Sequence, residues 1–158
     1  MLGIRLYASD HRESFPETLE DTAPYIGGTN LLERIVGAGN AGCLIYLRAP
    51  GQISERNPHF AAVIAPMENG CWIGRGDGSV WLTRKSAVNT LSEECQQLAK
   101  AQPGMTAVLS VGPGIVKPDV ERISQTLKEA GFSVMPTEEI PLAKRIRIQF
   151  SAPDSVKE

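Results

Sequence analysis

The stretch from Asn69 to Lys85 constrains the fold most, because it carries a strong β-hairpin signal. The pair Asp77-Gly78 stands between two runs that are rich in Trp, Ile, Val and Leu. A two-residue type I′ turn needs positive φ at both central positions, which Asp tolerates and Gly adopts freely. The sequence therefore predicts a hairpin that turns at these two residues.

The residues after the turn alternate in the manner of a strand with one buried face. Val80 and Leu82 share one side of this period-2 pattern. Trp72 and Trp81 flank the turn, where we expect cross-strand aromatic packing, with a binding platform as the alternative. The chain before the hairpin is turn-rich and the chain after it contains two amphipathic helices. We therefore interpret the hairpin as the seam between two modules.

Composition limits the classes of function. The chain has 158 residues, enough for one ordinary domain or two small ones, and 42 % hydrophobic with 22 % charged residues is typical of a globular protein. A net charge of −2 does not provide the basic field that nucleic-acid binders use. Three cysteines without a Cys-x-x-Cys pair and only two histidines make a zinc site an unfavourable interpretation, so no metal or cofactor is predicted.

The cysteines have different expected roles. Cys43 and Cys71 both lie in the strand-rich first half, where they could form a disulfide if the chain is exported. Cys95 falls on the apolar side of a predicted helix, where we expect a buried, inert thiol.

Short elements dominate the first half. The helix over residues 1–7 has no N-cap before it, which suggests that it was cut from something longer. The other predicted elements are a short helix over 17–25 ended by Gly27-Gly28, a strand over 41–48, and a strand over 59–65 stopped by Pro66.

The second half has clearer helical signals. A capping box at Thr90–Glu93 opens one helix, and the other predicted elements are a strand over 105–111, a helix over 118–130 ended by Gly131, and strands over 132–135 and 145–150. The middle three form a β-α-β unit. The alternation of Arg145 to Phe150 predicts an edge strand protected by arginines. Lys144 to Arg147 could contact anionic headgroups or an acidic partner, or form a solvated strand face.

A resemblance to type II secretion pseudopilins is carried by residues 2–16, followed by Leu19-Glu-Asp and Pro24-Tyr-Ile-Gly. The sequence is closest to the type IV pilin-like proteins with a processing-associated His…Asp-Gly signature. The Asp-Gly and Val-Trp pattern of Gly70 to Trp81 matches that family, and His59 would take the place of its histidine. The resemblance covers residues 1–85 and implies that a cleaved leader and a hydrophobic membrane helix precede Met1 in the full-length protein.

A second resemblance covers residues 73–136. The Asp-Gly-Ser-Val-Trp-Leu run, Leu91-Ser-Glu-Glu, Ala107-Val-Leu-Ser-Val and Leu127-Lys-Glu-Ala-Gly-Phe-Ser-Val are similar to the periplasmic domain of ExbD/TolR proteins. Those proteins transmit ion-driven motion from an inner-membrane motor to outer-membrane partners. The order strand, helix, strand, helix, strand agrees with that family.

Two motifs suggest enzymatic alternatives. Residues 37–42 satisfy Gly-x-Gly-x-x-Gly, but a strand rather than a helix is predicted to follow, so a glycine-rich loop is the preferred interpretation. Cys43 and His59 follow the nucleophile-then-base order of papain-like enzymes, although no oxyanion donor can be identified. A cytosolic hydrolase or nucleotide binder is therefore the third hypothesis. His11, in the turn after the first helix, is expected to cap backbone.

The sequence thus predicts an α+β fold in which a hairpin-rich head, residues 1–85, merges with a β-α-β-α-β module, residues 86–150, before a tail over 151–158. We prefer one continuous domain, because each half alone has a thin core. The expected protein is a non-enzymatic, periplasmic or cell-surface domain anchored to the inner membrane. Its partners would be proteins of a pilus, secretion or Ton/Tol-like assembly, and homo-oligomers are an option. The expected interaction residues are Trp72, Asp77, Gly78, Trp81 and His59.

Overall fold

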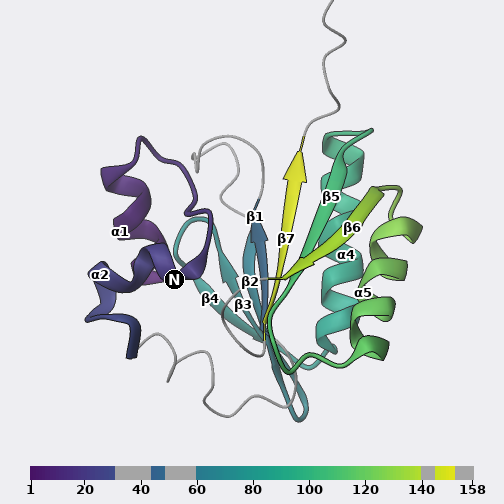
Figure 1. Cartoon of the computed structure of the whole chain (residues 1–158), viewed down its shortest axis with the longest axis horizontal. Coiled ribbons are helices and arrows are strands. Elements are labelled where there is room, and N and C mark those ends of the chain that lie inside the picture. The colour runs from purple at the N-terminus through teal and green to yellow at the C-terminus, as the bar shows by residue number, and fades with distance from the viewer. Residues whose placement is uncertain (31–43, 49–59, 140–144, 152–158) are drawn as a thin grey trace, which may run out of the picture.

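The computed structural model describes residues 1–30, 44–48, 60–139 and 145–151. Within these residues the fold is α+β, as predicted, with a mixed seven-stranded sheet between two helical layers (Figure 1). One layer holds α1 (Leu2–Asp10), the 3-10 helix η1 (Leu19–Thr22) and α2 (Ala23–Ile26). The other holds α4 (Ala87–Ala101) and α5 (Lys117–Glu129).

The sheet has the order β4-β3-β2-β1-β7-β5-β6. Its strands are β1 (Leu44–Arg48), β2 (Ala61–Met67), β3 (Gly70–Arg75), β4 (Val80–Thr83), β5 (Thr106–Val111), β6 (Ser133–Glu139) and β7 (Arg145–Ser151). Strands β1 to β4 form an antiparallel meander, and β7 pairs in parallel with β1 and antiparallel with β5. Strands from both halves of the chain therefore share one sheet. They are joined at β1 and β7, and the Asp77-Gly78 hairpin lies at the far edge rather than at a seam.

The predicted edge position of residues 145–150 is wrong, because β7 lies between two neighbouring strands. Its Ile146, Ile148 and Phe150 belong to the apolar core beneath α4 and α5. On the other face the Arg145 side chain is only 2 % exposed and forms an ion pair with Glu20 of η1. Arginines at alternate positions therefore mark a covered polar face here, and Arg145 is not a solvated side chain.

The apolar core has two layers, one on each face of the sheet. The larger layer combines α4 and α5 with the sheet through residues such as Leu91, Leu109 and Leu127. The smaller layer packs α1 and the following loop against β1 and β2 through Ile4 and Tyr46. Each face of the central strands is thus closed by a helical layer (Figure 1).

The β-α-β unit is confirmed, since β5 and β6 are parallel and α5 connects them. Gly131 ends α5 with a positive φ of 100°, as expected of a residue that follows a helix. Gly27 likewise caps α2 in the left-handed region. Strand β2 runs through Pro66, which pairs with Cys71, so the predicted stop came too early.

The predicted capping box at Thr90–Glu93 is wrong. Helix α4 begins at Ala87, and its N-cap is Ser86 rather than Thr90. The Ser86 hydroxyl accepts a hydrogen bond from the amide of Asn89. Thr90 is therefore inside the helix and buried. A Ser with extended backbone satisfies the first-turn amides as well as a Thr does, so two candidates compete in this sequence and the upstream one is used.

Candidate interaction surface at the sheet edge

The β3–β4 hairpin is confirmed, but its turn differs from the predicted type I′ geometry. Gly78 has a φ of 90°, whereas the described non-glycine residues with positive φ do not include Asp77. The amide of Gly78 donates to the carbonyl of Arg75 (2.9 Å), and the amide of Arg75 donates to the carbonyl of Ser79 (2.9 Å). A three-residue loop with one left-handed residue at its end has this pattern. Gly is needed at position 78 alone.

A short chain of hydrogen bonds orients Trp81. The amide and the hydroxyl of Ser79 both donate to Asp77 Oδ1, at 2.8 and 2.6 Å. The indole Nε1–H of Trp81 donates to Ser79 Oγ at 3.0 Å. Asp77 thus acts through Ser79 to hold the indole beside the turn, a positioning role that the Asp-Gly signal alone did not indicate.

Trp72 and Trp81 lie on opposite faces of the sheet. The register places Trp72 opposite Leu82 and Ile73 opposite Trp81, and directly opposed residues share a face. Ile73 belongs to the core layer under α4, so Trp81 is on the α4 side. The predicted packing of the two indoles on one another is therefore wrong.

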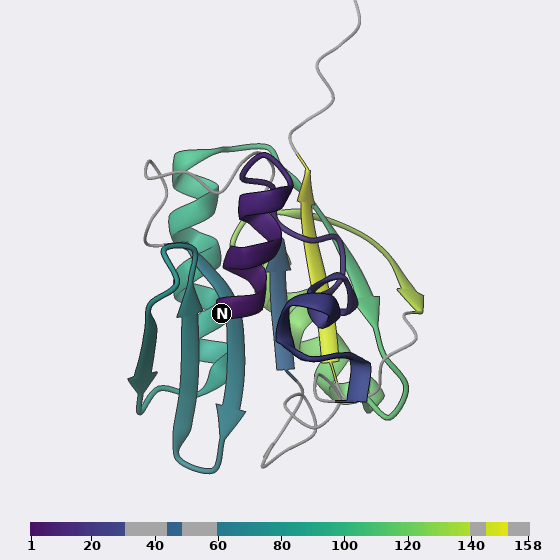
Figure 2. The same cartoon turned by 90° about the vertical axis from the view of Figure 1, so that its left-hand side faces the viewer.

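The edge strand β4 exposes apolar side chains, contrary to the predicted buried face. Exposed fractions are 55 % for Val80, 60 % for Trp81 and 58 % for Leu82, and Trp72 on the neighbouring strand is 42 % exposed. We call Trp72, Val80, Trp81 and Leu82 the edge patch. In Figure 2, α1 lies in front of the inner strands, and β4 lies at the margin of the sheet.

Met1 and the first turn of α1 pack beside this patch. An added Cβ at Gly74 would clash with the sulfur of Met1, so Met1 packs directly on β3 at this glycine. The Arg5 guanidinium donates to the carbonyl of Gly76 at 3.3 Å. Gly74 pairs with Val80, which places Val80, Trp72 and Leu82 on the α1 side. The hairpin is thus anchored along β3 while β4 remains open.

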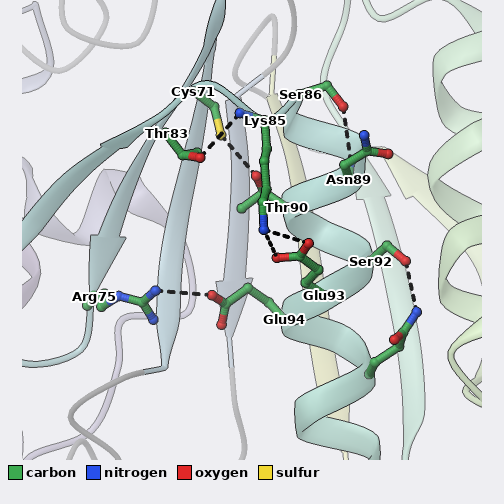
Figure 3. Close-up of polar contacts among 11 residues, drawn as sticks. Cys71, Arg75, Thr83, Lys85, Ser86, Asn89, Thr90, Ser92, Glu93 and Glu94 are labelled. Carbon is green, nitrogen blue, oxygen red and sulfur yellow. Dashed lines mark hydrogen bonds and ion pairs between the residues drawn. The ribbon is translucent and has the colours of Figure 1, made fainter.

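The other side of the hairpin is held by α4 (Figure 3). Arg75 contacts Glu94 at 3.3 Å, with the Glu94 side chain mostly buried. Lys85, after β4, contacts both carboxylate oxygens of Glu93 at 2.7 and 2.8 Å. Desolvation by burial raises the pKa of Glu94, and the neighbouring Arg75 only partly offsets this increase. Two ion pairs, one mostly buried and one exposed, therefore connect the hairpin to α4.

The cysteines near this surface are buried. Cys71 is a free thiol in the core, 3.3 Å from Thr90 Oγ1, and burial raises its pKa. Its predicted disulfide partner Cys43 lies outside the described residues. Cys95 is confirmed as a buried thiol, because it is almost fully covered and burial raises its pKa to about 12.

Of the two histidines discussed above, only His11 lies within the described residues. His59 and the glycine-rich loop over 37–42 lie outside the described residues. His11 follows α1, where its Nδ1–H donates to the Tyr7 carbonyl at 2.8 Å and its ring stacks on Tyr7 with centroids 3.8 Å apart. It therefore caps the end of the helix, as expected.

A pocket in the described part of the chain was not predicted from the sequence. It lies where β5 ends and α5 begins, and is lined by Val111, Gly112, Pro113, Gly114, Ile115, Lys117, Val120 and Glu139. Its charged groups are one lysine and one carboxylate, and its walls are backbone and aliphatic side chains. The Gly-Pro-Gly sequence at 112–114 was the available signal for a turn at this place.

The described part of the chain contains no group of three or more His, Cys, Asp or Glu side chains placed to hold a metal ion. None of the helices in the described ranges has the length and apolar character needed to cross a membrane. Comparison of the chain with protein-family models, with curated proteins and with solved structures found no match in any of the three.

Proposed function

We propose that this chain is a non-enzymatic domain that makes protein–protein contacts outside the cytoplasm, in a pilus or type II secretion-like assembly. The observation that carries the proposal is the edge patch. Val80, Trp81 and Leu82 are consecutive and each more than half exposed, and they lie on β4, whose outer side pairs with no other strand of the described residues. The assignment to a pilus or secretion apparatus rests on the resemblance of residues 2–16 to pseudopilins.

The geometry of the edge patch suits a contact surface. Tryptophan supplies a large apolar area with few rotatable bonds, so ordering it at an interface costs little conformational entropy. Here the Trp81 indole is already held by Ser79 at 3.0 Å. The outward backbone groups of β4, which pair with no strand within the described ranges, can form hydrogen bonds with an extended partner. The apolar side chains therefore provide binding affinity, and the backbone hydrogen bonds fix the orientation of the bound strand.

Site-specific photo-crosslinking in the source cells tests this proposal. A benzophenone amino acid is placed at Trp81 in the full-length protein, and the matched control carries it at Met135, a half-exposed apolar residue on the opposite edge strand β6. We expect adducts from position 81 with proteins of a pilus or secretion assembly, in the membrane fraction. Equal labelling from both positions, or a purely cytosolic protein, would contradict the proposal.

A specific observation also favours an ExbD/TolR-like adaptor as the second candidate. The elements β4, α4, β5, α5 and β6 follow one another in the order that this family resemblance implies. In that case the crosslinked proteins would belong to an ion-driven inner-membrane motor and its outer-membrane partners. Mass spectrometry of the position-81 adducts separates the two candidates.

A further inference from the structure

The two edges of the sheet differ in their protection against pairing. Strand β6 contains Pro136, which has no amide hydrogen to donate, and ends at the exposed Glu139. Proline and charge at an edge discourage the addition of another strand. Strand β4 has neither within Val80–Thr83. In the described residues, no strand pairs with its outer side.

The register identifies which backbone groups of β4 face outward. The amide of Arg75 donates to the carbonyl of Ser79, so this pair is hydrogen-bonded. Hydrogen-bonded and non-hydrogen-bonded pairs alternate along an antiparallel ladder. The carbonyl of Ser79, and the amide and carbonyl groups of Trp81 and Thr83, therefore face β3. Val80 and Leu82 direct theirs outward.

We infer that the partner of the edge patch is a second copy of this chain, joined through antiparallel β4–β4 pairing with Trp81 on the two-fold axis. This inference rests on the proposed function, because it assigns the occupant of the same surface. In this register Val80 of one copy exchanges its outward backbone hydrogen bonds with Leu82 of the other. The contact uses the same patch on both copies and closes as a dimer.

Side-chain complementarity singles out this register. With Trp81 on the axis, Val80 lies opposite Leu82 and Ser79 lies opposite Thr83, so apolar faces apolar and hydroxyl faces hydroxyl. Beyond the strand, the register brings the turn that holds Asp77 in one copy toward Lys85 of the other, so opposite charges lie on the same side, with the Lys85 ammonium also held by Glu93. A shift of the axis to Leu82 would instead set Val80 against Arg84 and Trp81 against Thr83. Cross-strand pairs of like character stabilise a sheet, and mismatched pairs do not.

Self-association of two matched double variants tests the inference. In Val80→Lys/Leu82→Glu, each lysine lies opposite a glutamate of the other copy if Trp81 is on the axis. In Val80→Lys/Leu82→Lys, the same positions bring lysine against lysine. We expect a concentration-dependent dimer of the 158-residue wild-type chain in sedimentation equilibrium, retained by the Lys/Glu variant. The Lys/Lys variant should dimerise at least about tenfold more weakly, because two like-charge pairs replace two apolar ones.

A cysteine placed on the axis supplies an independent measurement. Opposed residues in a non-hydrogen-bonded antiparallel pair are close enough for a disulfide. Trp81→Cys should therefore give a reducible dimer, and Thr83→Cys, which faces Ser79 of the other copy, should not. Circular dichroism and thermal melting verify that each variant is folded.

Several outcomes would overturn the inference. A wild-type chain that is monomeric at every concentration removes the second copy as partner. Equal association of the Lys/Glu and Lys/Lys variants, or equal crosslinking at positions 81 and 83, excludes the proposed register. None of these results removes adducts between position 81 and a different protein in cells, so failure of self-pairing is distinguishable from failure of the proposed function.

Discussion

Strands β7 and β4 have similar alternating sequences but opposite surroundings. Arg-Ile-Arg-Ile-Gln-Phe looks like an exposed edge, yet β7 lies in the interior of the sheet with Arg145 buried. Val-Trp-Leu-Thr looks half-buried, yet β4 is an edge strand whose Val80, Trp81 and Leu82 are all exposed. A period-2 pattern shows that the two faces of a strand differ. It does not show what covers each face.

The difference follows from what packs on each strand. On β7 one face meets α4 and α5, and the other meets η1, whose Glu20 receives the Arg145 guanidinium. On the hairpin, Met1 packs against Gly74 of β3, whereas Leu82 of β4 is 58 % exposed in the described structure. A charged residue in the middle of the sheet can therefore be more buried than a leucine at its edge when an ion-pair partner covers it. The following predictions test this contrast, beginning with the largest effect.

Ile148→Ala should cause the largest loss of stability. Ile148 is fully buried between α4, α5 and the sheet, so the truncation leaves a cavity in the middle of the core. We expect the free energy of unfolding to fall by about 4 kcal/mol in urea denaturation. Ile148→Val, which removes a single methyl group, should cost about 1 kcal/mol. If the alanine variant lost less than about 1 kcal/mol, β7 would not lie in the middle of the core.

Arg145→Met should be the next most damaging change. It leaves Glu20 without its ion-pair partner beside the buried face of β7, and a broken buried pair costs about 3 kcal/mol. Adding Glu20→Met should restore most of this loss, since two apolar side chains of similar volume can replace a buried pair. Chemical denaturation of the two single variants and the double variant gives the interaction free energy between residues 20 and 145. Additive losses would show that the two residues do not interact.

The buried thiol of Cys95 should also make the free energy of unfolding decrease at alkaline pH. Burial raises the pKa of Cys95 from 9.0 to about 12, so between these values the folded state keeps a proton that the unfolded state releases. Stability is then complete below pH 9 and falls as pH rises toward 12. Urea unfolding between about pH 8 and 11 should show this decline. Cys95→Ala should reduce its slope, whatever it does to stability at neutral pH, and an unchanged slope would contradict the assignment.

Several elements could be predicted from the sequence because their signals are local. The hairpin at Asp77-Gly78, the helix ended by Gly131 and the buried Cys95 each depend on a few neighbouring residues. The position of β7 could not be predicted, because it depends on pairing with β1, and the burial of Arg145 depends on Glu20, which is 125 residues away in the chain. The turn type was missed because Asp-Gly is compatible with both the two-residue and the three-residue loop, and only the pairing of Arg75 with Ser79 distinguishes them.

The edge patch was predicted only in part, because Val80 and Leu82 were expected on a buried face and are exposed. Trp72 and Trp81 flank the turn as expected, but the register places them on opposite faces. Exposure of Leu82 depends on which distant elements pack over the edge of the sheet, and this arrangement is not encoded near the hairpin. The sequence thus indicated the two tryptophans, and the tertiary arrangement decides which side chains at this edge are exposed.

Leu82→Thr should have the smallest effect on the folded monomer and is the most direct test of the contrast. Leu82 is exposed and Thr is compatible with a strand, so at low protein concentration the free energy of unfolding should change by less than about 0.5 kcal/mol. At high concentration the wild type should gain stability through self-pairing, because a partner that binds only the folded state adds to stability by mass action. The variant should lose this concentration dependence. A loss of about 2 kcal/mol at low concentration would instead show that Leu82 is part of the core, and β4 and β7 would then be alike.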